Sequence, residues 1–312
     1  MRGRNIAWFT ASALLIAMAG AAVSRAAQQG AASSRVPVTL IVSVEARQGK
    51  EIPLINREDV RVFQGRERLQ VTEWVPLQGD QAEVELFVLI DDAMETTVGS
   101  RLNDIRQFLL AQPATTAIGV AYIRHGTLQV VQKLTKDHAQ AGKALRLPIG
   151  QSGAVNPYLS IPDLIKRWAE SPARREILLF SDGVNRLQDG PNDFYLAEAV
   201  DRAQRAGIQI STIYCSGAGH GGHSFRRFHW GLNNLSQLAD ETGGEAYSQG
   251  FQMPITFTPF LEEFADRLKH QYRLTVLAKP EKKASYQRIR VETEVPNADL
   301  VAAERIFVPA AK

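Results

Sequence analysis

The chain has 312 residues, 45% hydrophobic and 22% charged, a balance that excludes a disordered protein and predicts a globular one with a substantial core. The formal net charge of +3 is carried by Arg2, Arg4 and Arg25 at the very start of the chain. The remainder is close to neutral, so no overall field is present to recruit nucleic acid or an acidic membrane. Cys215 is the single cysteine, which excludes a disulfide within the chain.

Residues 1–27 predict a secretory signal peptide. A basic start is followed by an apolar run from Ile6 to Ala22 and by small residues that suit cleavage before the polar stretch at residue 28. The apolar run is short for a transmembrane span, and no second run follows. We therefore expect an exported, periplasmic or secreted protein with no transmembrane span after cleavage. The alternative is a leader that is retained as an anchor.

Residues 28–80 predict a β-rich segment. After a polar lead-in, Val36 to Val44 alternates apolar and polar residues, which is typical of a half-exposed strand. Short strand-like pieces follow between Leu54 and Leu77, separated by Gly65 and by charged residues that suit hairpin turns.

Residues 81–270 predict an α/β domain. Strands are expected at 84–90, 177–180, 208–215 and 245–248, with 117–123 and 128–134 as a hairpin. Helices are expected at 101–110, 137–145, 158–169, 194–206, 232–241 and 259–270. This alternation favours a Rossmann-like, doubly wound and mostly parallel sheet with helices on both faces.

Residues 271–312 alternate again like strands, at 272–277, 288–293 and 306–308. We expect these strands to pack on the N-terminal β-rich segment, so that the two ends of the chain complete one small module around the α/β domain.

Two of the apolar strands end in acidic residues. Val84 to Ile90 runs directly into Asp91 and Asp92, and the strand ending at Phe180 runs into Ser181 and Asp182. Ligands of open α/β sheets bind at the carboxyl ends of the strands. We therefore predict that these two strands are parallel neighbours and deliver their acids to a shared site.

Four segments resemble a von Willebrand factor type A (VWFA) domain: LFVLIDD, EILLFSDG, AVDRAQRAGIQISTIY and LSQLADETGGEAY. The resemblance covers about Val84 to His270. The flanks LINREDVRVFQGRERLQVTEW and HQYRLTVLAKP are similar to exported bacterial VWFA-related proteins first grouped from acidobacterial sequences. The resemblance implies a binding or adhesion module rather than an enzyme.

The resemblance also implies a divalent-cation site, from which this chain departs. VWFA domains hold the ion with an Asp-x-Ser-x-Ser loop, a threonine and a later aspartate. Asp91 and Asp182 match the two aspartates, but Ala93 and Glu95 stand at the serine positions, and Asn156 is the best oxygen donor near the threonine position. An ion held by Asp91, Glu95, Asp182 and Asn156 would be almost neutralised by its ligands, and Ca²⁺ would tolerate such a site better than Mg²⁺.

Residues 215–230 offer three further interpretations. Cys215, His220, His223 and His229 could bind zinc or copper, although their spacing fits no standard zinc motif. The glycines of SGAGHGGH match a dinucleotide motif, but no helix is expected directly behind them, so we predict no nucleotide. The arginines and aromatic residues that follow favour a long loop that contacts a partner.

The sequence thus favours an exported, non-enzymatic binding module with a degenerate metal site, which binds a protein or an envelope polymer. The predicted contact residues are Asp92, Thr96, Thr97, Tyr158, Asn185, His220, His223, Arg226, Arg227 and Trp230. The alternative is a Ca²⁺- or Mg²⁺-dependent adhesion or sensing site built on Asp91, Glu95 and Asp182. A third interpretation is a metalloenzyme that uses the His-rich loop. No catalytic residue is predicted, because no nucleophile-elbow motif is present.

Overall fold

The computed structural model describes residues 35–49, 51–150, 156–188, 190, 193–217, 225–250 and 252–310. The predicted signal peptide, His220 and His223 lie outside these residues. No helix among those described combines the length and the apolar character that crossing a membrane requires.

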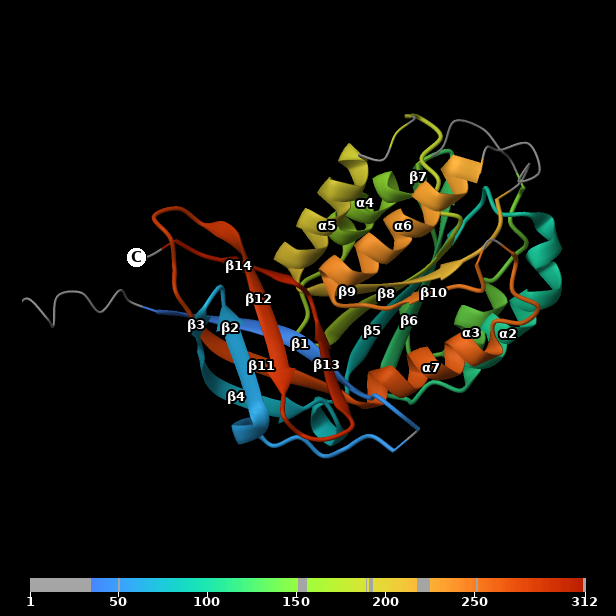
Figure 1. Cartoon of the computed structure of the whole chain (residues 1–312). Coiled ribbons are helices and arrows are strands. Elements are labelled where there is room, and N and C mark those ends of the chain that lie inside the picture. The colour runs from blue at the N-terminus through green and yellow to red at the C-terminus, as the bar shows by residue number, and fades with distance from the viewer. Residues whose placement is uncertain are drawn as a thin grey trace, which may run out of the picture.

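A six-stranded sheet forms the centre of the α/β region, in the order β10-β9-β8-β5-β6-β7 (Figure 1). Its strands are β5 (Val84–Asp91), β6 (Thr116–Arg124), β7 (Thr127–Thr135), β8 (Arg174–Ser181), β9 (Ile208–Tyr214) and β10 (Ala246–Tyr247). All neighbours pair in parallel except β6 and β7, which form the predicted antiparallel hairpin. The α/β fold class is confirmed.

Helices cover both faces of this sheet, as its apolar strands require. One face carries α2 (Leu102–Leu110), α3 (His138–Lys143) and α7 (Thr258–Lys269), and the other carries α4 (Ser160–Arg167), α5 (Phe194–Ala206) and α6 (Phe225–Thr242) (Figure 1). Alternate residues of β5 point to the two faces of the sheet. Leu86 and Val88 pack in the core under α2 and α7, whereas Phe87 and Leu89 pack in the core under α4 and α5.

The α6 helix begins earlier than the sequence pattern indicates. We expected a helix over 232–241 and a contact loop through Trp230, but residues 225–230 form the first turns of α6. The predicted loop is therefore wrong for Arg226, Arg227 and Trp230, and a helix does follow the glycine-rich segment. Buried Gly231 lies so close to the loop after β8 that a Cβ atom would collide with the Asp182 carbonyl, so α6 packs against that loop near its start.

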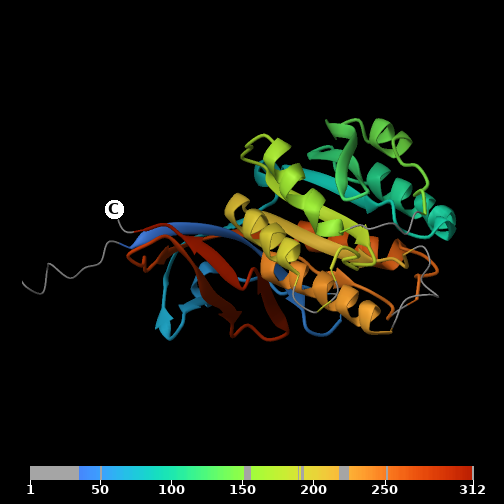
Figure 2. The ribbon, with the colours of Figure 1, turned by 90° about the horizontal axis from the view of Figure 1, so that it is seen from above.

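The two ends of the chain form a β-sandwich. One sheet has the order β13-β1-β11-β4 and the other β14-β12-β2-β3. The strands are β1 (Val36–Ala46), β2 (Val60–Gln64), β3 (Glu67–Arg68), β4 (Gln70–Pro76), β11 (Gln271–Ala278), β12 (Ser285–Thr293), β13 (Ala298–Ala302) and β14 (Arg305–Val308). β11 lies between β1 and β4, so the strand that follows α7 pairs with strands that precede β5. Figure 2 shows the sandwich at one end of the molecule and the α/β region at the other.

Short 3-10 helices complete the connections: η1 (Arg57–Asp59), η2 (Gly79–Gln81), η3 (Thr96–Arg101) and η4 (Pro157–Leu159). The loops after β5, β6, β8 and β9 meet at one edge of the central sheet, here called the carboxyl edge. The opposite edge, where these strands begin, faces the sandwich (Figure 1).

Candidate binding face at the carboxyl edge

The two acid-bearing strand ends are neighbours. β5 and β8 pair in parallel, with Ile90 opposite Phe180, so Asp91 and Asp182 emerge side by side at the carboxyl edge. The Ser181 hydroxyl donates a hydrogen bond of 2.8 Å to Oδ2 of Asp91 and links the two ends. The predicted proximity of these strand ends is confirmed.

Asp91 is buried, with an exposed fraction of 1%. Its Oδ1 accepts a hydrogen bond of 2.9 Å from the backbone N–H of Ala93, which follows two residues later in the loop. Burial removes water from this carboxyl group and nearby Asp182 repels its negative charge, and together they raise the pKa of Asp91 to about 6.

Arg186 supplies the positive charge beside this acid pair. Its guanidinium forms an ion pair with the Asp182 carboxylate, and the two side chains are only 4% and 2% exposed. The Asp182 Oδ1 also accepts a hydrogen bond of 3.0 Å from the backbone N–H of Val184. Burial opposes the charged form of Arg186, but Asp182 and then Asp91 outweigh it and raise the pKa of the guanidinium.

Gly217 closes this ion pair from the β9 side. A Cβ atom at this position would collide with the Asp182 carboxylate and with Arg186 Nη2. Only glycine therefore allows the backbone after β9 to pack against the pair. The same backbone also bridges to Met94, and the Ser216 carbonyl accepts a hydrogen bond of 3.0 Å from the Glu95 N–H.

The two other predicted metal ligands have local partners. The Glu95 carboxylate is half-buried and accepts a hydrogen bond of 3.2 Å from the Thr97 hydroxyl. Asn156 is fully buried, and its carbonyl oxygen accepts from the Tyr158 N–H at 2.8 Å, which caps η4. Its amide nitrogen donates to Asp193 at 3.3 Å. Asn156 thus stabilises the start of η4, in the connection between α3 and α4.

These contacts do not fit a divalent cation. The Asp182 carboxylate is ion-paired to a buried guanidinium, and the Asn156 oxygen already accepts a backbone hydrogen bond. A divalent cation needs several free oxygens arranged around one point. The Asp182 oxygens are not free, because the Arg186 guanidinium contacts them. Within the described part of the chain, no three His, Cys, Asp or Glu side chains are grouped closely enough to hold a metal ion.

Two predicted contact residues are inside the protein. The Asp92 carboxylate is 4% exposed and forms two hydrogen bonds of 2.7 Å with the Arg146 guanidinium, which lies 3.8 Å above the centre of the Tyr122 ring. Tyr158 is fully buried, and its hydroxyl donates to the Gly183 carbonyl at 2.8 Å. Both side chains position the loops of the carboxyl edge and cannot touch a partner's surface.

The other predicted contact residues that the structure describes lie at or near this edge. Thr96 and Thr97 are exposed at the start of η3, and half-buried Asn185 accepts a hydrogen bond of 2.9 Å from the Leu187 N–H. Arg226 is exposed on the first turn of α6, whereas Arg227 and Trp230 are half-buried there.

Exposed apolar side chains gather at the same edge, and the sequence analysis missed them. Among the described residues, eight large hydrophobic side chains are exposed, and five lie on segments that border the carboxyl edge: Leu147 (54%), Ile149 (37%), Leu187 (47%), Phe194 (70%) and Ile255 (87%). Contacts fix the position of these segments. The Gly150 N–H donates to the Asp92 carbonyl, and Arg101 of η3 donates to the Pro254 carbonyl.

No family model matches the chain, and no curated protein matches it. Three of the solved structures to which the chain is similar are described here. An aerotolerance-related membrane protein from Bacteroides fragilis, with multiple mutations to serine, is 14% identical with a TM-score of 0.42, covering 59% of this chain and 98% of that one. The SpRpn10 VWA domain is 16% identical with a TM-score of 0.35, covering 60% and 93%. The vWF domain of the type V pili tip protein Mfa5 from Porphyromonas gingivalis is 14% identical with a TM-score of 0.42, covering 59% and 94%. Two of the three are described as VWA or vWF domains, the family that the sequence motifs of this chain resemble.

Proposed function

We propose that this chain is an exported, non-enzymatic binding module that recognises a protein partner through its carboxyl edge. The contact surface comprises residues 95–97, 146–150, 185–188, 254–256 and the exposed side chains at the starts of α5 and α6. The observation that carries the proposal is that five of the eight large hydrophobic side chains exposed among the described residues lie on these segments.

Exposed apolar groups are unfavourable in water unless a partner covers them, and clusters of them mark interaction sites. Phe194 and Ile255 are the most exposed apolar side chains at this edge, with exposed fractions of 70% and 87%. Polar side chains are exposed on the same segments, among them Thr96, Thr97 and Arg226. Apolar side chains together with arginine are typical of protein interfaces.

Buried polar contacts hold the loops under this surface in place. The Asp92–Arg146 pair anchors one loop, the Asp182–Arg186 pair a second, and the Tyr158 hydroxyl a third. Loops held in one conformation lose little entropy on binding, which favours affinity.

We further propose that binding does not require a metal ion. In this account the Arg186 guanidinium neutralises the acid pair that would otherwise hold a divalent cation. The Ser181 hydroxyl is buried and donates to Asp91, so it is a structural group rather than a nucleophile. Calcium-dependent adhesion through Asp91, Glu95 and Asp182 is the competing account, and the experiment below separates the two.

The test uses the mature chain, immobilised and exposed to envelope proteins from the cells that encode it. A Phe194→Ser, Ile255→Ser double variant is compared with Leu54→Ser, which removes an equally exposed side chain (76%) from the segment before η1. We expect the double variant to capture at least about tenfold less partner than the wild type. Leu54→Ser and the EDTA-treated wild type should capture as much as the untreated wild type.

Equal capture by both variants would overturn the proposed surface. Loss of capture in EDTA, restored by Ca²⁺, would overturn the metal-independent mechanism and support the competing account.

A further inference from the structure

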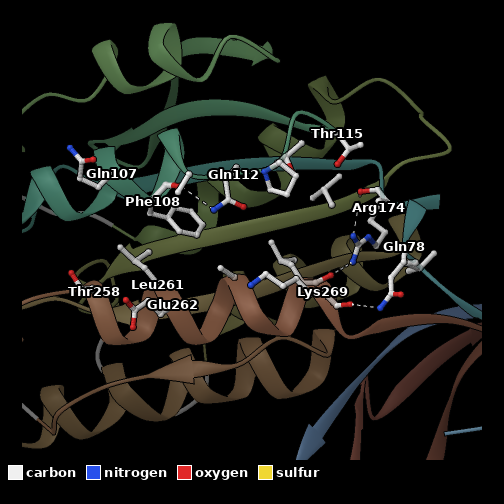
Figure 3. Close-up of a pocket in the computed structure, with 18 of the residues that line it drawn as sticks. Gln78, Gln107, Phe108, Gln112, Thr115, Arg174, Thr258, Leu261, Glu262 and Lys269 are labelled. Carbon is white, nitrogen blue, oxygen red and sulfur yellow. Dashed lines mark hydrogen bonds between the residues drawn. The ribbon is translucent and has the colours of Figure 1, made fainter. Parts of the chain in front are cut away.

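A cavity lies at the opposite edge of the sheet, where β5, β6 and β8 begin. It has a volume of about 640 Å³ and opens between α2 and α7, next to the segment that joins β4 to β5 (Figure 3). Cavities of roughly 300–1,000 Å³ are typical of small-molecule sites. None of the residues proposed above for partner binding lines it.

The walls of this cavity are apolar along most of its length. Phe108 of α2 faces Leu261 of α7 across it, and Leu77, Val84, Ala265 and Leu268 continue the lining (Figure 3). Such walls favour a ligand with a hydrocarbon body.

One end of the cavity is cationic. Arg174, the first residue of β8, is buried to 8% exposure and lines this end with Gln78 and Lys269 (Figure 3). Lys269 is exposed, and its ammonium lies 3.8 Å from Asp266. At the far end, the Asp104 carboxylate already accepts hydrogen bonds from Thr256 and from the Phe257 N–H.

Among the described residues, the hydrogen-bond partners of Arg174 are neutral groups. Its Nη1 donates to the Leu268 carbonyl at 2.7 Å and to the Gln271 side chain, and its Nε has no hydrogen-bond partner among the described residues. A buried charge normally has an ion-pair partner, because an unpaired one is costly.

Glu176, two residues along β8, does not fully supply that partner. Its carboxyl group is buried and accepts a hydrogen bond of 3.0 Å from Gln271. Burial, only partly offset by Gln271 and Arg174, raises the pKa of Glu176 to about 7. A substantial fraction of this carboxyl group is therefore neutral near pH 7.

We propose that this cavity binds a single-chain amphipathic carboxylate of the fatty-acid class. The carboxylate lies at the cationic end, which Arg174 and Lys269 line, and the hydrocarbon chain lies between α2 and α7. The two cations at one end and the apolar side chains of α2 and α7 select this class over neutral or cationic amphiphiles. Asp104 and the exposed Glu262 also line the cavity, and their negative charges confine the carboxylate to the cationic end.

The test is calorimetric titration of the mature chain with dodecanoate, and separately with dodecyltrimethylammonium, both below their micelle concentrations. Ala265→Phe fills the cavity without changing a charge, and Ala197→Phe makes the same change on the exposed face of α5. Arg174→Gln and Lys269→Gln remove the two cations one at a time.

We expect one dodecanoate per chain, bound at least about tenfold more tightly than the cationic amphiphile. Ala265→Phe and Arg174→Gln should each weaken dodecanoate at least about tenfold, Lys269→Gln less, and Ala197→Phe not at all. If Arg174→Gln does not fold, the Ala265→Phe comparison and the head-group comparison still decide. Equal affinity for both head groups, or unchanged binding by folded Ala265→Phe, would overturn the proposal.

Discussion

Arg186 determines the chemistry of the carboxyl edge at the residue scale. It lies four residues after Asp182, and the loop between them folds back so that the guanidinium meets that carboxylate in a buried site. Removing one partner of a buried ion pair leaves the other charge uncompensated, which is more costly than losing a surface pair. Asp91 would then share the site with Asp182 without a cation.

Arg186→Met should therefore lower the free energy of unfolding by about 3–5 kcal/mol. Arg202→Met is the matched control, because Arg202 pairs with Glu198 on the surface of α5 and its side chain is 57% exposed. We expect this control to change stability by less than about 1 kcal/mol. Urea unfolding of both variants measures the difference, and similar values would show that the Asp182–Arg186 pair is not important for stability.

Glu176 gives a pH-dependent prediction at the same scale. Folding raises the pKa of this carboxyl group from 4.5 to about 7. Glu176 therefore contributes its full stabilisation below about pH 4.5, and this stabilisation is lost as pH rises through 7. Glu176→Gln removes this titration. Between pH 4.5 and 8, its free energy of unfolding should therefore rise by on the order of 2–3 kcal/mol relative to that of the wild type. Urea unfolding at both pH values measures the gain, with exposed Glu58→Gln as control. A constant difference between Glu176→Gln and wild type would contradict the assigned shift.

At the scale of elements, two glycines bring α6 against the loop after β8. A Cβ on Gly231 of α6 would collide with the Asp182 carbonyl, and one on Gly183 would collide with the Gly231 carbonyl. Gly183 also has φ +68°, a conformation that favours glycine. The close approach of α6 therefore holds the loop that carries Arg186.

Gly231→Ala should force α6 away from this loop and destabilise the protein by about 1–3 kcal/mol, despite the better helix propensity of alanine. Ser236→Ala, at an exposed position of the same helix, should be close to neutral. Thermal unfolding of the two variants gives the comparison. An increase in stability for Gly231→Ala would show that the contact is not close in solution.

The elements were largely predictable from the sequence, but the details of the site were not. Continuous apolar runs predicted β5 and β8, because buried parallel strands have a distinctive composition. The acids that follow both strands predicted that the two strands are neighbours. The pairing of Asp182 with Arg186 depends on loop geometry, and a spacing of four outside a helix carries no directional information. The apolar side chains of the carboxyl edge come from segments far apart in sequence, so only the fold brings them together.

At the scale of the whole molecule, the strand after α7 ties the α/β region to the sandwich. Gln271, the first residue of β11, donates to Glu176 and Gln209 at the amino ends of β8 and β9. Arg267 at the end of α7 pairs with Glu45 of β1 and donates to the Gly243 carbonyl. We propose that the segments before residue 80 and after residue 271 fold as one unit. The domain boundaries themselves stay a prediction.

A chain ending at His270 lacks β11, and β1 and β4 then lose the strand that lies between them. We expect backbone amides of residues 36–76 to exchange with solvent at least about tenfold faster in this truncation. A chain ending at Val308, which keeps all the described strands, should match wild type. Hydrogen exchange measures both. Protected amides in the chain ending at His270 would mean that the N-terminal strands fold alone.

The most direct test of the central claim, that Arg186 replaces a metal ion at the carboxyl edge, is calorimetric titration of the mature chain with Ca²⁺ and with Mg²⁺. The account predicts no binding to the wild type at millimolar ion concentrations. Binding of either ion to the wild type, abolished by Asp182→Asn, would contradict it.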